Sequence, residues 1–269
     1  MTACRIFLAL AFLAGTTLSS LAQDKPAGSA KATATEADFE PIKQRLQPAD
    51  FLDSVGQQTK TLWRRLYREA PPPPSTDRLR VAFTLGGIIA DCYLTLQASD
   101  AQKFKDTNQD VQTYVKVLGM GEKLSPALLS ERKMAETEDW MNTRRQVGDI
   151  QVQIEKLLVN QKDEDLAVLV DLGMWMRLFE ITTSVFQNNP ELNNRTLCIG
   201  SKALLDDLKA RYDKMSEATR KNEGVTHLGS TLDLLQRHWE AAGTHPEHDI
   251  VDLTHEKVAF LMGRLTLMR

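Results

Sequence analysis

The feature that most constrains the fold is the spacing of apolar residues, which recur every three to four positions in one segment after another. In the stretch from Trp140 to Leu158, for example, Val147, Ile150 and Ile154 share one helical face. Six or seven segments show this pattern, and none alternates apolar and polar residues convincingly as a half-buried strand does. Short connections favour antiparallel neighbours. The sequence therefore predicts an all-α protein, an antiparallel helical bundle of six or seven helices.

Capping residues and prolines predict where these helices begin and end. We expect one helix over 78–118, because Thr76 or Asp77 can cap its first turn. A second should start at Ser125, whose hydroxyl precedes a proline, and continue to residue 158. A third is expected over 163–186.

The first 22 residues carry the pattern of a cleaved secretory signal. Arg5 precedes an apolar stretch, residues 6–14, that is too short to span a bilayer, and small residues lead to a cleavage point after Ala22. No later segment reaches about 18 apolar residues without charges, so we expect no membrane span after cleavage. These features predict export, and we place the mature protein in the bacterial periplasm.

Composition divides the exported chain into four parts. Residues 23–36 are small and polar, which is typical of a disordered tether. Residues 37–70 have the pattern of an amphipathic helical segment, and residues 71–77 begin with four prolines that predict a stiff linker. Residues 78–269 would form the bundle. We interpret residues 37–70 as an element that docks on the bundle or on a protein partner.

Charge and motifs exclude several classes of function. The 33 basic and 36 acidic residues give a net charge of −3, whereas nucleic-acid binders usually show a basic excess. The chain contains no HExxH, GxSxG or phosphate-loop motif, so no catalytic centre is recognisable and we expect no cofactor. After signal cleavage Cys92 and Cys198 remain, either as a disulfide or as two buried thiols.

Charged residues inside the most apolar helical stretches are the strongest candidates for a site. Asp91 lies in one such stretch, and Arg177 and Glu180 lie in another. Because burying an unpaired charge costs several kcal/mol, each should have a partner. Either Asp91 and Arg177 form a structural ion pair, which a matched apolar replacement of both could substitute, or they hold a ligand. Gly86 and Gly173 in the same stretches indicate a close helix crossing.

All five histidines fall between residues 227 and 255, among acidic residues, which makes this segment a weak candidate for a metal site. The candidate ligands are His238, His245, His248 and His255. However, no two of them have the HxxxH spacing that brings two imidazoles together on one helix. We therefore interpret them as ordinary polar residues.

Taken together, these patterns predict an exported, soluble helical protein with a non-catalytic role, binding or scaffolding in the bacterial cell envelope with an unidentified protein partner. The alternative is a bundle that binds a small ligand or a metal, as a sensor or carrier. The two hypotheses differ in whether Asp91, Arg177 and Glu180, or the histidines, contact anything outside the chain.

Overall fold

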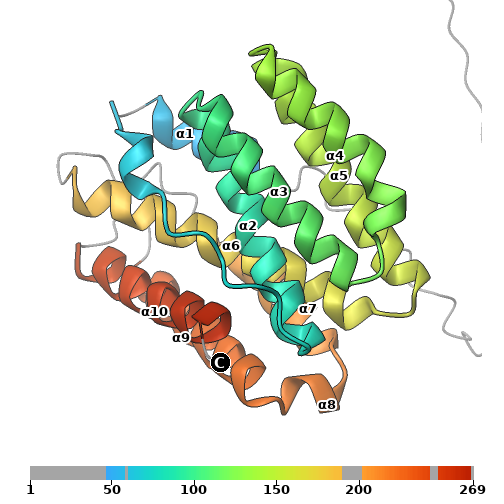
Figure 1. Cartoon of the computed structure of the whole chain (residues 1–269). Helices are drawn as coiled ribbons and strands as arrows, with labels where there is room; N and C mark the ends of the chain where they lie inside the picture. The colour runs from blue at the N-terminus through green and yellow to red at the C-terminus, as the bar shows by residue number, and fades with distance from the viewer. Residues whose placement is uncertain (1–46, 58–59, 190–201, 243–247, 268–269) are drawn as a thin grey trace, which may run out of the picture. The chain divides into compact units, whose positions relative to one another are not determined.

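The computed structural model describes residues 47–57, 60–189, 202–242 and 248–267, and in these ranges the all-α prediction is confirmed (Figure 1). The described chain contains ten α-helices, one short 3-10 helix and no strand. In chain order they are α1 (Pro48–Gly56), η1 (Trp63–Leu66), α2 (Arg78–Gln97), α3 (Ala101–Val117), α4 (Gly121–Glu136), α5 (Trp140–Asn160), α6 (Glu164–Gln187), α7 (Lys202–Lys214), α8 (Glu217–Arg220), α9 (Glu223–Ala242) and α10 (His248–Leu267).

The predicted number of helices, six or seven, is too low for the described residues. The helix expected over 78–118 is divided into α2 and α3 at Ser99, whose φ of 47° is left-handed. The carboxylate of Asp100 then caps α3 by accepting a hydrogen bond from the Lys103 N–H at 3.1 Å. The break contains neither glycine nor proline, and the apolar spacing continues past it. The sequence therefore contained no signal that the helix ends there.

The helix expected over 125–158 is also two helices. The first of them, α4, begins four residues before Ser125, so that Pro126 lies inside the helix rather than at its first position. The second, α5, follows a break at Glu138, whose φ is 57°. By contrast, of the two caps predicted for α2, Thr76 or Asp77, the structure has Asp77, which accepts from the Leu79 N–H at 3.0 Å.

Helices α2 and α6 cross closely and share the most extensive helix–helix contact in the described structure. A Cβ atom on Gly86 would lie 1.9 Å from the carbonyl oxygen of Val170, and one on Gly173 would lie 2.0 Å from that of Phe83. No side chain fits at either position. The close crossing predicted from these two glycines is therefore confirmed.

The other helices pack around this pair. Helices α3, α4 and α5 follow one another in contact, and α5 returns to α2 and α6. On the other side, α10 packs on α6 and α2, α9 packs on α10, and α7 packs on α9 (Figure 1). Within the described residues, α2 is the helix long and apolar enough to cross a membrane, and 83% of its most apolar window is buried among its neighbours.

The chain before α2 belongs to the same core. Phe51 and Leu52 of α1 are fully buried, and the ring of Phe51 meets Trp175 of α6 edge-on, with centroids 5.6 Å apart. The helix predicted over residues 37–70 is found, within its described residues, only in α1 and η1. We call residues 60–77 the strap: apart from η1 they are non-helical, and the Tyr114 hydroxyl donates to the Pro72 carbonyl at 2.7 Å.

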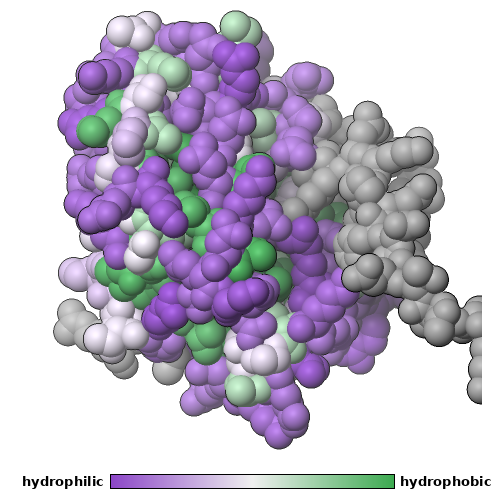
Figure 2. All heavy atoms as spheres, turned by 90° about the vertical axis from the view of Figure 1, so that its right-hand side faces the viewer, coloured by the Kyte–Doolittle hydropathy of each residue, from purple (hydrophilic) through white to green (hydrophobic). Residues whose placement is uncertain are grey.

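Figure 2 shows the side of the molecule toward α4 and α5, which is mostly hydrophilic with hydrophobic atoms between. On α5, Met141, Val152 and Val159 are 78%, 47% and 43% exposed. Their spacings of eleven and seven residues place them along one line of the helix. Exposed apolar residues of this number are ordinary on a protein surface.

Candidate functional site

The charged residues predicted from the sequence meet at the α2–α6 crossing. Asp91 accepts a hydrogen bond from Arg177 Nε through Oδ1 at 2.8 Å, and one from Arg68 Nε of the strap through Oδ2 at 2.7 Å. Arg177 also donates from Nη1 to Glu180 at 2.8 Å and from Nη2 to the Leu66 carbonyl at 2.8 Å. We call Arg68, Asp91, Arg177 and Glu180 the charge cluster.

The charges of this cluster balance one another. Burial by itself would raise the pKa of Asp91, but the guanidinium groups of Arg177 and Arg68 outweigh it and hold that pKa below its ordinary value. Burial likewise opposes the charge on Arg177, but Asp91 and Glu180 raise its pKa above the usual value. The side chain of Arg177 is 5% exposed, so these partners replace nearly all of its water. Asp91 and Arg177 therefore stay ionised near neutral pH.

Arg68 is the member that the sequence did not predict. A Cβ atom on Gly87 would lie 2.8 Å from Arg68 Nη2, so this glycine makes room for the guanidinium. That Nη2 is buried and has no hydrogen-bond partner in the described structure. Beside it, a cavity of about 20 Å³ has a volume that suits a single water molecule and no organic ligand. Arg68 belongs to residues 37–70, which the sequence predicted as an amphipathic helical segment, and nothing in the local pattern indicated that this arginine turns inward.

A second buried acid, Glu131, lies between α3 and α4. It is 3% exposed and accepts a hydrogen bond from Asn108 Nδ2 at 2.6 Å. Burial raises its pKa from 4.5 to about 8, so at neutral pH it is mostly protonated. The sequence held a signal for it, because Glu131 falls on the buried stripe of Leu124, Leu128 and Ala135.

The histidine candidates do not form a metal site in the described part of the chain. His255 Nδ1 lies 3.0 Å from Thr183 Oγ1 of α6, and His238 Nδ1 lies 2.8 Å from a carbonyl oxygen of its own helix. His248 begins α10, but its side chain is not described, and His245 lies outside the described residues. Among the side chains that are described, no three His, Cys, Asp or Glu residues are grouped to hold a metal ion.

The cysteine prediction is tested only at one of its two positions. Cys92 is a free thiol, 3% exposed, and burial raises its pKa well above the ordinary value. Cys198 lies outside the described residues, as do the predicted signal (1–22) and tether (23–36).

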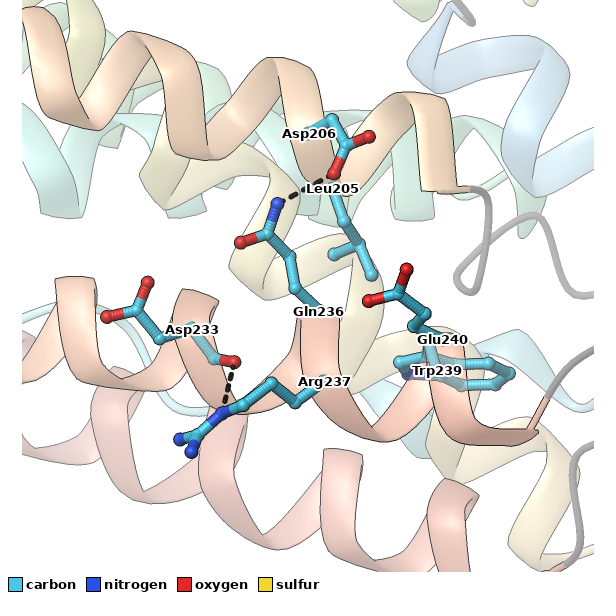
Figure 3. A pocket seen from close by; sticks show the side chains of 7 residues that line it. All are labelled: Leu205, Asp206, Asp233, Gln236, Arg237, Trp239 and Glu240. Atoms are coloured by element: carbon cyan, nitrogen blue, oxygen red, sulfur yellow. Dashed lines mark hydrogen bonds between the residues drawn. The ribbon is translucent and has the colours of Figure 1, made fainter.

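A groove of about 530 Å³ between α7 and α9 is a further candidate (Figure 3). Gln236 of α9 donates to Asp206 of α7 at 2.8 Å, which links the two helices. Trp239 donates from Nε1 to Thr254 of α10 at 3.1 Å, so its ring is held in place. The groove is lined by Leu205, Asp206, Asp233, Gln236, Arg237, Trp239 and Glu240. Most of these residues are polar positions that the sequence pattern assigns to a solvated surface.

Searches against protein-family models, curated proteins and solved structures each find no match to this chain. Function therefore has to be inferred from the geometry and chemistry of these sites.

Proposed function

We propose that this chain is an exported, non-catalytic binding or scaffolding protein of the bacterial cell envelope. The observation that carries the proposal is the pairing of Asp91 and Arg177 with groups of their own chain. Asp91 is bound on both oxygens by arginines of its own chain, and Arg177 uses Nε, Nη1 and Nη2 on protein acceptors. Such a cluster joins the strap, α2 and α6 at the centre of the fold.

The pKa shifts in the cluster support the non-catalytic part. A general acid or base works best with a pKa near the operating pH. The pKa of Asp91 is lowered and that of Arg177 is raised, so both move away from neutrality. These directions suit a permanent ion pair that fixes the packing of helices.

A native mass spectrum of the protein after expression with export to a periplasm tests the proposal. We expect the mass of residues 23–269 with no adduct. A chain that keeps residues 1–22 would contradict the export part, and a retained metal ion or small molecule would contradict the scaffolding part.

The second candidate function is binding of a small molecule in the α7–α9 groove. Its volume of about 530 Å³ lies within the range of about 300–1,000 Å³ found for small-molecule sites. If the native spectrum shows an adduct, Asp206→Asn combined with Glu240→Gln should remove it. Glu217→Gln on α8, an exposed residue outside the groove, is the matched control. An adduct that survives the double substitution would exclude the groove.

A further inference from the structure

A smaller cavity, separate from the α7–α9 groove, lies where the first turns of α2 and α9 meet the last turns of α10. Its volume is about 220 Å³. Its apolar lining includes Phe83, Leu169 and Val225, each at most 2% exposed. Two arginines, Arg80 of α2 and Arg264 of α10, also line it. The cavity thus combines an apolar floor with two guanidinium groups from different helices.

Arg80 has unused hydrogen-bonding capacity. A guanidinium carries five N–H donors, yet within the described ranges that of Arg80 makes no hydrogen bond or ion pair, although it is partly buried. The neighbouring acid, Asp77, uses its carboxylate to cap α2, accepting from the backbone N–H groups of Leu79 and Arg80. An anion entering the cavity would give the Arg80 side chain an acceptor.

Arg264 shows which chemical group this cavity accepts. Its Nη2 contacts the carboxylate of Glu223, at the first position of α9. The Arg264 side chain is 24% exposed, whereas that of Glu223 is 79% exposed. An ion pair with so exposed a partner contributes little to stability, so another oxyanion can replace Glu223 at small cost.

We propose that this cavity binds a small oxyanion, a phosphate or a carboxylate group on a short apolar body, held between Arg80 and Arg264. Guanidinium groups suit such ligands because their N–H donors match the geometry of paired oxygens. The apolar floor strengthens the attraction by lowering the local dielectric. Since about 220 Å³ is below the size of drug-like sites, the ligand must be small. Glu223 then acts as an internal competitor.

The test is isothermal titration calorimetry of the exported chain with inorganic phosphate and, separately, with butanoate, at constant ionic strength. We expect heat of binding from at least one probe, which identifies the preferred group. Arg80→Gln and Arg264→Gln should each weaken binding about tenfold, the loss expected for a charge-assisted hydrogen bond. Glu223→Gln should tighten binding severalfold, because it frees Arg264 and removes a competing negative charge.

Arg65→Gln is the matched control, since Arg65 is exposed in η1 and lines none of the three cavities described above. It should bind like the parent. The proposal is overturned if neither probe binds, if Arg80→Gln binds as tightly as the parent, if Arg65→Gln weakens binding equally, or if Glu223→Gln weakens it. Within the described ranges the Arg80 side chain makes no hydrogen bond or ion pair that the substitution would break, so its variant keeps the test valid even if Arg264→Gln fails to fold. Failure of this test leaves the scaffolding proposal as it stands, whereas an anion bound tightly enough to be retained in the native mass spectrum would contradict its scaffolding part.

Discussion

Replacing Asp91 by alanine tests the structural role of the charge cluster directly. The substitution leaves Arg177, 5% exposed, with Glu180 and the Leu66 carbonyl as acceptors, and it removes the carboxylate that binds Arg68. Removing one partner of a buried ion pair costs about 3–5 kcal/mol, because the other charge stays buried. We expect the free energy of unfolding of Asp91→Ala, from urea titration followed by circular dichroism, to fall by that amount.

Multiple substitutions distinguish a cluster from a simple pair. From the sequence, replacing Asp91 and Arg177 together by apolar residues should restore stability. The structure changes that expectation, because Asp91→Leu with Arg177→Met would leave the partly buried Arg68 and Glu180 without these partners. We expect recovery only when Arg68→Met and Glu180→Leu are added, to within about 1–2 kcal/mol of the parent.

Two results would refute this reasoning. One is a loss below about 1 kcal/mol for Asp91→Ala, the value of an exposed ion pair. The other is full recovery in the double variant. Either result can be interpreted only if the unfolding free energy depends on urea concentration with the same slope as in the parent. A changed slope indicates an altered denatured or native state.

Three further predictions concern the core. Gly86→Ala should lower the free energy of unfolding by about 3 kcal/mol or more, since its Cβ would meet a backbone oxygen at 1.9 Å. The control, Gly263→Ala, should raise the free energy of unfolding by about 0.5–1 kcal/mol, because a Cβ there would have nothing within 4 Å. Equal effects in the two urea titrations would contradict the close crossing. Because the folded Glu131 carboxyl keeps a proton that the unfolded chain loses, its contribution to stability should fall by about 1.4 kcal/mol per pH unit from about pH 5 to about 8. Glu131→Gln should remove that slope in urea titrations across this range, and an unchanged slope would contradict the assignment. In native protein at pH 8, Cys92 should resist a thiol reagent until urea unfolds the chain, because its thiol is buried with a raised pKa. Mass spectrometry of the peptide that contains Cys92 measures how much of it is modified with and without urea.

The sequence predicted well what depends on neighbours along the chain. Apolar residues at spacings of three and four lie on one side of a helix, whatever that side packs against, so the all-α class followed. Asp77 was recognised as a cap because a cap bonds to N–H groups two or three residues away. Asp91, Arg177 and Glu180 were recognised because a charge within an apolar run is costly unless it is paired.

The partners of the buried charges and the breaks between helices depended on the tertiary structure. Arg68 lies 23 residues from Asp91, and Arg177 lies 86 residues from it, so no local pattern joins these three residues. Ser99 and Glu138 adopt left-handed φ values, which non-glycine residues rarely do, so nothing in their own preferences marked these breaks. The sequence by itself determined that the chain is helical and that its core contains charges. Only the tertiary structure decided that Arg68 and the Leu66 carbonyl join Asp91 and Arg177, because these contacts are made by atoms in space and not by positions along the chain.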